Sequence, residues 1–401
     1  MYPLEMEDIY RVLEETIRDA GIRRALEVSS ERIEKNPLKV LSRYPYLESF
    51  REEVRKAKEE VLRNIDYYID MTMKSVEEIM GTAHLAKNRD EVYKLVDEYV
   101  GEPPKLVIKS KSMVTEEIKL REYLEGSGHR VVETDLGELL IQIAREKPMH
   151  TIAPAVHMTK ERAVKLLKSV GVKVSESPTL EEIVAQVRHY LRNIFIEADV
   201  GISGGNTIAA DTGAIFLISN EGNIRNTTNL PPIHIAIISI EKIMPNMELA
   251  YKQALLQAAN AGLYPPTYLS IIAGPSSTAD IEQKRIYGVH GPGKVIVILY
   301  DGGRSKYLDD PVIWEQLLCI KCGRCQGVCP VWSITGNYWG GPVYGGPMGM
   351  GWTAITEDER LASKLSLFCL LCARCTEVCP MDIQLHKIIH ELKTRLMARW
   401  G

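Results

Sequence analysis

Residues 319–330 read CIKCGRCQGVCP and residues 369–380 read CLLCARCTEVCP, two copies of the pattern C-x2-C-x2-C-x3-C-P. All eight cysteines of the chain lie in these two runs. Thiolates are soft ligands that suit iron–sulfur clusters, and a two-residue gap lets three successive sulfurs converge on one cluster from a tight loop. The pattern therefore predicts two 4Fe-4S clusters as cofactors.

The fourth cysteine of each run is predicted to serve the cluster of the other run. It lies too far along the loop to join the first three, and in two-cluster ferredoxins it ligates the second cluster. Such crossed ligation holds two clusters close enough for fast electron transfer. The predicted ligands are Cys319, Cys322, Cys325 and Cys379 for cluster 1, and Cys369, Cys372, Cys375 and Cys329 for cluster 2.

Zinc and disulfide bonds are the alternatives for such cysteines. Two zinc ions need only C-x2-C pairs, which explain neither the third cysteine nor the C-P that ends each run. Disulfides suit short secreted chains, whereas this chain has 401 residues and opens with Glu5, Glu7 and Asp8 in place of a basic-then-apolar leader. We therefore expect a cytoplasmic protein, peripheral to the membrane only through partners. A structural or regulatory role for the clusters stays open.

Charge and hydropathy argue against two further classes. The 49 basic and 53 acidic residues are mixed along the chain, so no basic surface for nucleic acid is indicated. The longest apolar runs, such as 235–240 and 295–299, are well short of the about 20 residues that a membrane-spanning helix needs. We expect neither nucleic-acid binding nor a transmembrane segment.

The spacing of apolar residues divides the chain into three regions. We predict an N-terminal helical region at 1–90, an α/β domain at 91–308 and an all-helical ferredoxin domain with the two clusters at 309–401. Helices are expected over 4–86, because apolar residues there recur every three or four positions between charged ones. The clearest stripe is Leu47, Phe50, Val54, Ala57, Val61, Ile65 and Ile69.

In the middle region, short apolar runs alternate with helix-length amphipathic stretches. This alternation predicts a mainly parallel sheet with helices on both faces. Function in such folds collects in loops at the carboxyl ends of strands, here 201–211 and 220–232. The expected strands are 106–108, 131–132, 152–155, 215–218, 234–240, 269–273 and 295–299, and the expected helices include 115–125, 160–169 and 180–193.

The segment between the cysteine runs is unusual in composition. Residues 336–351 hold seven glycines, together with Pro342 and Pro347. So many turn-forming residues predict an irregular loop, packed over the clusters or against a partner. A helix is expected after the second run, at 383–397, which suits a helical ferredoxin module.

Several motifs resemble one known family. The resembling segments are KSKSM (109–113), TEE (115–117), ETDLGE (133–138), Gln142, APAVH (153–157), ADVGI (198–202), Asn206, DTG (211–213), NEGN (220–223), LPP (230–232), Glu241, Lys242 and DGGRS (301–305). Together with both cysteine runs, they closely resemble the LutB-type iron–sulfur proteins of lactate utilisation. The resemblance implies a LUD domain, with a fold similar to the NagB/RpiA/CoA-transferase group.

The same resemblance implies partners and a reaction. It suggests a role beside a cysteine-rich, heterodisulfide-reductase-like subunit and a second LUD protein in the oxidation of L-lactate to pyruvate. A flavoprotein dehydrogenase is a further expected partner, because no nicotinamide or flavin motif is visible in this chain. A heterodisulfide-reductase-like or other dehydrogenase complex is the alternative. So is a LUD-domain enzyme that binds a CoA ester or sugar phosphate and senses redox state through its clusters.

Few residues of the LUD domain suggest catalysis. Glu221 follows an apolar run, where a carboxylate can act as nucleophile or base. The alternative is that Glu221 and Asn223 bond backbone groups in a tight loop, which we favour because no paired acid or base is legible nearby. We interpret His84, His157 and His234 as hydrogen-bonded packing residues. Candidates for an anion pocket at strand-to-helix turns are Lys111, Ser112, Thr115 and Asn206.

Overall fold

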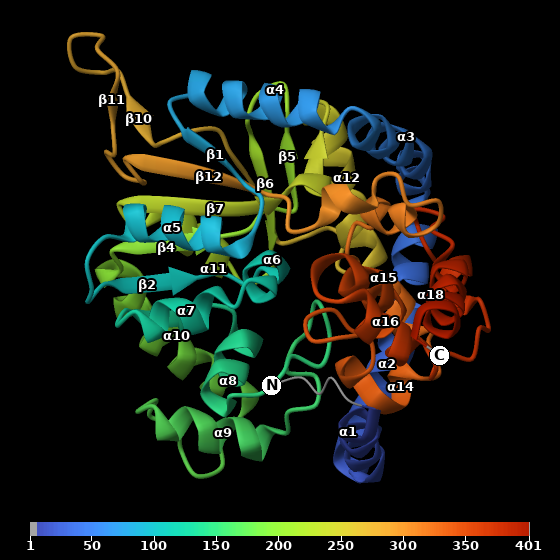
Figure 1. The fold of residues 1–401 in the computed structure, drawn as a ribbon. Helices are drawn as coiled ribbons and strands as arrows, with labels where there is room; N and C mark the ends of the chain where they lie inside the picture. The colour runs from blue at the N-terminus through green and yellow to red at the C-terminus, as the bar shows by residue number, and fades with distance from the viewer. Residues whose placement is uncertain (1–5, 401) are drawn as a thin grey trace.

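A six-stranded sheet forms the centre of the α/β half of the protein (Figure 1). The computed structural model describes residues 6–400. All five strand pairings in this sheet are parallel, so the predicted parallel α/β fold is confirmed. In spatial order the strands are β1 (Thr82–Ala86), β12 (Lys294–Tyr300), β7 (Ile233–Ser239), β4 (Val200–Ser203), β2 (Leu106–Lys109) and β3 (Arg130–Glu133).

The central strands are buried on both faces, which is why they read as continuous apolar runs. Ile237 of β7 packs in the apolar cluster that includes α5 (Arg89–Val100) and α7 (Leu120–Gly126). The next residue, Ile238, points to the other face and packs in the cluster that includes α4 (Ile65–Glu78). Alternate side chains of one strand therefore tie two helical layers to the sheet.

A second, smaller sheet lies beside the first and was not predicted. Its strands are mostly short, and its pairings are both parallel and antiparallel. Helix α12 (Met247–Asn260) packs against it. A two-stranded arm, β10 (Ser277–Thr278) and β11 (Ile286–Tyr287), projects from the molecule (Figure 1). In order, the strands of the second sheet are β8 (Ile243–Met244), β5 (Thr207–Ala209), β6 (Ile215–Ser219) and β9 (Tyr268–Ile272).

The helices of the α/β half largely match their expected positions. Helix α9 (Lys160–Ser169) has the expected bounds and α10 runs from Leu180 to Glu197, each capped by a threonine side chain. The helix expected at 115–125 is split into α6 (Met113–Glu117) and α7, because Lys119 has a left-handed φ of 50°. The remaining helices of this half are α8 (Leu136–Ala144) and α11 (Asn223–Asn229).

Several other expectations about secondary structure were wrong. Residues 82–86 form the edge strand β1 instead of helix, because β12 supplies backbone partners that local sequence does not reveal. Residues 152–155 form no strand: the amides of Ile152 and Ala153 donate to His150 Nδ1 instead of to a sheet. The loops expected at 201–211 and 220–232 contain β4, β5 and α11.

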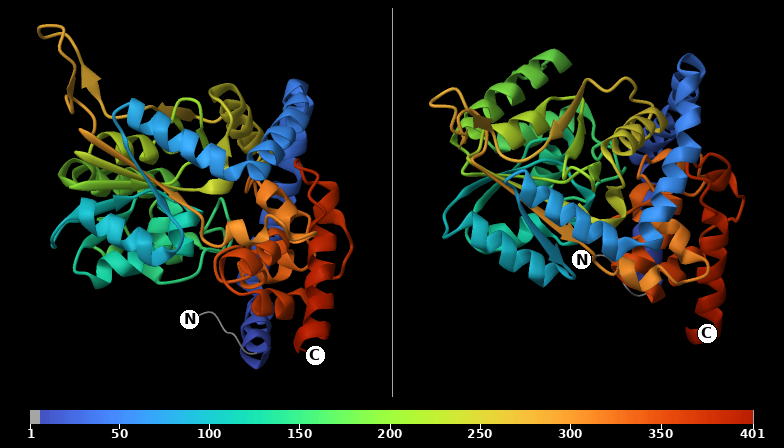
Figure 2. Two further views of the ribbon diagram at one scale, coloured as in Figure 1. Left: turned by 45° about the horizontal axis from the view of Figure 1, so that its top comes forward. Right: turned by 90° about the horizontal axis from the view of Figure 1, so that it is seen from above.

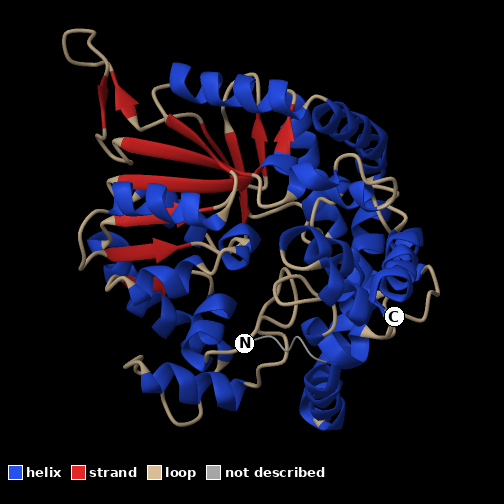
Figure 3. Ribbon diagram, viewed as in Figure 1, coloured by secondary structure: helices blue, strands red, loops and turns tan. Residues whose placement is uncertain are grey.

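The C-terminal half, which carries both cysteine runs, contains helices but no strand within the described residues, as Figure 3 shows. The N-terminal helices run alongside it (Figure 2), and α2 packs against α13 and α14. Within residues 6–400, no helix is both long and apolar enough to cross a bilayer. The helices are α1 (Met6–Arg18), α2 (Ala20–Arg43) and α3 (Phe50–Arg63), then α13 (Arg324–Gly327), α14 (Trp332–Thr335), α15 (Gly346–Thr356), α16 (Glu359–Ser366), α17 (Arg374–Glu377) and α18 (Leu385–Trp400).

The glycine-rich segment is more regular than its composition indicates. Its second part begins the buried helix α15, which contradicts the expectation of an irregular loop throughout. A Cβ atom at Gly349 would lie 2.4 Å from the Tyr344 carbonyl oxygen, and one at Gly351 would lie 2.4 Å from Gln316 Oε1. These glycines therefore allow close packing between helix and surrounding chain. Trp339, outside the helix, is fully buried.

Buried ion pairs join the two halves of the molecule. Glu241, directly after β7, accepts a 2.5 Å bond from Arg304 Nε and a bond from Lys321 Nζ in the first cysteine run. Arg304 also donates to both oxygens of Glu117, at 2.7 and 3.0 Å. Burial alone raises the pKa of a carboxyl, but the charges of Arg304 and Lys321 outweigh it and hold the pKa of Glu241 well below its usual value.

Removing Arg304 is predicted to destabilise the whole protein. Arg304→Met leaves Glu117 and Glu241 buried beside one fewer cation, which should lower the free energy of unfolding by about 3–5 kcal/mol. Anaerobic urea unfolding of the cluster-loaded protein measures this change. The control is Arg18→Met, which removes an exposed ion pair worth about 1 kcal/mol or less. Equal stability of the two variants would contradict the predicted role of the buried pairs.

Candidate functional site

Two small cavities in the helical half are each lined by four cysteines. The first is lined by three cysteines of the first run and one of the second, together with Met348, Met381, Ile383 and Leu385. The second is lined by three cysteines of the second run and one of the first, together with Trp339 and Leu371. Each has a volume of about 20 Å³. The sets are Cys319, Cys322, Cys325 and Cys379, and Cys329, Cys369, Cys372 and Cys375.

The two runs fold as local copies of each other. Lys321 and Leu371, at the third position of each run, both have left-handed φ angles, 57° and 54°. Their amides donate to the first sulfur of the run, Lys321 N to Cys319 Sγ at 3.3 Å and Leu371 N to Cys369 Sγ at 3.4 Å. The equivalent turns direct each run's first three cysteines toward one cavity.

The chemistry of these sulfurs fits an iron–sulfur cluster. Desolvation raises the pKa of Cys322, Cys329, Cys375 and Cys379 to about 12, so these thiols stay protonated at neutral pH unless a cation stabilises the thiolate. Bound metal does this outright. The predicted crossed ligand sets are thus the sets that the fold brings together, and ligation itself remains a prediction.

The two cysteine sets differ in exposure. Cys372 of the second set is exposed, whereas the cysteines of the first set are buried except for Cys319, which is partly exposed as Cys369 is. Leu370, between those two cysteines, has 68% of its surface exposed. The second set therefore lies near the protein surface.

A third and larger cavity lies in the α/β half, where four adjacent parallel strands end. It has a volume of about 600 Å³. Residues one to three positions after the ends of β2, β3, β4 and β7 line it, which is the usual ligand position in open parallel sheets. Cys319, Ile320 and Lys321 form another part of its wall, so the cavity touches the loop of the first cysteine set.

Several residues that line this cavity have a buried polar atom without a hydrogen-bond partner within the protein. These atoms are Lys111 Nζ, Ser112 Oγ, Thr151 Oγ1 and Gln253 Oε1. Ser112, Thr151 and Gln253 are all more than nine-tenths buried. The lining also includes Lys242, whose Nζ donates to the Gly205 carbonyl at 2.8 Å.

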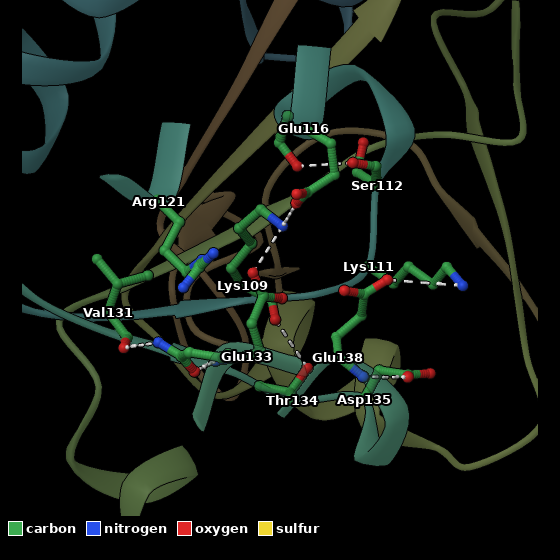
Figure 4. Close-up of polar contacts among 12 residues, drawn as sticks. Lys109, Lys111, Ser112, Glu116, Arg121, Val131, Glu133, Thr134, Asp135 and Glu138 are labelled. Atoms are coloured by element: carbon green, nitrogen blue, oxygen red, sulfur yellow. Dashed lines mark hydrogen bonds and ion pairs between the residues drawn. The ribbon is translucent and has the colours of Figure 1, made fainter. Parts of the chain in front are cut away.

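A carboxylate cluster lies beneath Lys111 (Figure 4). Lys109 Nζ is fully buried between Glu116 Oε1 at 2.9 Å and Glu133 Oε1 at 2.8 Å. Burial raises the pKa of Glu133 to about 8, with Lys109 opposing the rise and the neighbouring carboxylates adding to it. Glu138 lies 3.6 Å from Lys111 Nζ. Of these carboxylates, Glu138 is the one that pairs with Lys111 at the wall of the large cavity.

The structure separates the candidate LUD residues into two groups. Lys111, Ser112, Asn206 and Glu221 line the cavity, whereas Thr115 does not: its hydroxyl donates to the Ser112 carbonyl at 2.8 Å. The Glu221 carboxyl accepts from Leu136 N at 3.1 Å. Desolvation of that carboxyl, together with the charge of Asp135, raises its pKa to about 7. No catalytic partner for Glu221 emerges from these contacts.

The three histidines each form a side-chain hydrogen bond, in agreement with their interpretation as packing residues. His84 contacts Tyr99 at 2.7 Å, His157 contacts Glu146 at 3.1 Å, and His234 contacts Ser203 at 2.7 Å. Burial lowers the pKa of His234 to about 4, which keeps it neutral at physiological pH.

Sequence reasoning missed several cavity residues. Two of them could have been found from the sequence. Lys242 closely follows the apolar run at 234–240, and Lys321 lies beside Cys322 in the first cysteine run. Thr151 and Gln253 carried no such signal, because each is a single polar residue brought to the cavity by tertiary folding.

Comparison with known proteins agrees with this two-part architecture. Residues 69–300 match the LUD domain, and residues 315–383 match the 4Fe-4S dicluster domain. Lactate utilization protein B of Bacillus licheniformis is 33% identical over 95% of this chain and 78% of its own length. The same-named protein of Macrococcus caseolyticus is 33% identical over 86% and 70%. That of Bacillus subtilis is 34% identical over 82% and 67%.

Exchanging single cysteines tests the crossed ligand sets. Cys329→Ser should damage the same cluster as Cys372→Ser, because both residues line the second small cavity. Cys379→Ser should instead resemble Cys322→Ser. Iron analysis and electron paramagnetic resonance of the four variants, prepared anaerobically, would show the pairing. A Cys329→Ser spectrum that matches Cys322→Ser would contradict the crossed sets.

Proposed function

The chain belongs to the family of Lactate utilization protein B, a LUD domain joined to a 4Fe-4S dicluster domain, and from this premise we propose that it is an electron-transfer subunit. The complex it serves is an oxidoreductase that converts L-lactate to pyruvate. The observation that carries this proposal is the pair of cavities lined by interleaved cysteine sets.

Two clusters suit this reaction in number and in position. A bound 4Fe-4S cluster supplies one-electron redox chemistry, and oxidation of a 2-hydroxy acid to a 2-oxo acid releases two electrons with two protons. Cys319 of the first cysteine set lines the LUD cavity, and Cys372 of the second set is exposed at the surface. The proposed electron path therefore begins at the cluster beside the LUD cavity and ends at the cluster near the surface.

The chemical step on lactate is proposed to occur on a partner. The sequence shows no nicotinamide- or flavin-binding motif, and the Glu221 carboxyl accepts a hydrogen bond from the backbone amide of Leu136, which is neither an acid nor a base. Proposed partners are a cysteine-rich, heterodisulfide-reductase-like subunit, a second LUD protein or a flavoprotein dehydrogenase. The exposed face around Cys372 and Leu370 is the proposed place of contact.

The isolated chain should carry electrons without oxidising lactate. Anaerobically prepared protein is expected to contain about eight irons and eight sulfides, two 4Fe-4S clusters. It should be reduced by dithionite but not by lactate, since the proposed substrate site lies on another subunit. Iron and sulfide analysis with optical titration measures both. Reduction by lactate in the absence of any partner would disprove this division of labour.

A charge at the proposed contact face should slow transfer to the partner. Leu370→Asp places a carboxylate where an apolar side chain is expected to be buried, and should weaken partner binding by about tenfold. Its matched control is Ile281→Asp on the β10–β11 arm, because Leu370 is 68% exposed and Ile281 is 67% exposed. Iron content confirms that both variants keep their clusters. Equal electron-transfer rates in the two variants would move the contact face elsewhere.

A further inference from the structure

We propose that the cavity of the LUD half binds an organic anion with an apolar body and one charged end, seated against the loop that carries Cys319. This inference goes beyond the proposed electron-transfer function and does not depend on it. It rests on the size of the cavity, on its unpartnered polar atoms and on its position.

The size of the cavity indicates a ligand larger than a three-carbon acid. Its volume of about 600 Å³ lies within the range of about 300–1,000 Å³ typical of sites for drug-sized and cofactor-sized molecules. Apolar side chains from several elements contribute much of the wall, which suits an extended apolar body. They include Met113, Leu140, Ile152, Val156, Leu217 and Ile320.

The donors for a charged group meet at the turn after β4. A Cβ atom at Gly204 would lie 2.5 Å from Ser112 Oγ, so the Ser112 hydroxyl sits directly against this turn. Lys242 Nζ bonds the carbonyl of the next residue, Gly205. A hydroxyl without a partner and an ammonium bonded to a neutral carbonyl thus lie against consecutive residues of one turn, Gly204 and Gly205.

The electrostatics of this turn favour an anion. Burial lowers the pKa of Lys242 to about 7, and the charge of nearby Lys321 adds to the fall. A bound anion would offset both effects and keep Lys242 charged. Lys321 is itself paired with Glu241, which leaves Lys242 as the ammonium available to a ligand at this wall.

Carboxylates elsewhere in the cavity lining limit the ligand to one anionic group. Asp135 and Glu221 line the cavity near Lys111, and Lys111 already lies 3.6 Å from Glu138. A second anionic group near these carboxylates would be repelled. The remaining unpartnered atoms, Thr151 Oγ1 and Gln253 Oε1, can bond neutral polar groups of the ligand body.

The position of the site gives it a spectroscopic readout. Cys319 lines both this cavity and the first small cysteine cavity. An anion bound there places negative charge beside the cluster proposed on Cys319, and reduction adds further negative charge to that cluster. Ligand binding is therefore expected to lower the midpoint potential of that cluster more than that of the other.

The test uses 8-anilinonaphthalene-1-sulfonate, which has an aromatic body and one sulfonate. Anaerobic calorimetry of the cluster-loaded chain should show one site per chain. Lys242→Met should weaken binding by about tenfold or more, and Ser112→Ala by about fivefold, the values expected for a charged and a neutral hydrogen bond. The control is Lys165→Met, an exposed lysine of α9, which should leave binding unchanged.

Each outcome decides for or against the proposal. Absence of one-site binding of the probe would overturn the proposal. An affinity for the probe that is unchanged in both Ser112→Ala and Lys242→Met would also overturn it. Lactate or inorganic phosphate displacing the probe at similar concentrations would overturn it as well, because neither has an apolar body. A redox titration with and without the probe should show the larger fall in midpoint potential at the cluster proposed on Cys319. Normal binding by a chain that fails to transfer electrons would disprove only the proposed function.

Discussion

The arrangement of the two halves of this protein depends on the buried ion pairs that the Glu241 carboxylate forms. This carboxylate lies at the carboxyl end of β7, where it accepts from Arg304 beyond β12 and from Lys321 inside the first cysteine run. A buried carboxylate is costly unless its charge is paired. The end of the sheet and the cysteine loop therefore stabilise each other only when they meet, and this contact places the two halves of the chain.

This contact also explains why the LUD cavity and the first cysteine set share a wall. Lys321 reaches Glu241 with its ammonium, while its backbone amide donates to Cys319 Sγ. One residue thus connects the strand end that forms the cavity with a predicted cluster ligand. Indole and phenol rings complete its surroundings: Lys321 Nζ lies 4.2 Å from the Trp352 ring centroid and 5.5 Å from that of Tyr344.

The sequence was most informative where a structure depends on local spacing. The cysteine runs could be assigned because their turns are built from a few consecutive residues, and β7 and β12 because burial on both faces makes a continuous apolar run. β5 and β8 are too short to show a period, and β1 depends on its partner strand. The helix at Gly346 depends on close packing that composition does not encode, and Lys242 gains its place in the cavity only through the fold.

The difference in exposure between the two cysteine sets indicates a different role for each set. A centre on Cys319, Cys322, Cys325 and Cys379 can sense the LUD cavity, but most of its cysteines are buried. A centre that includes Cys372 reaches the surface but does not line that cavity. The proposed crossed use of Cys329 and Cys379 would place the two proposed centres side by side, with each run contributing to both. A buried site and an external partner can then be connected by one folded module, which a single centre in either position would not achieve.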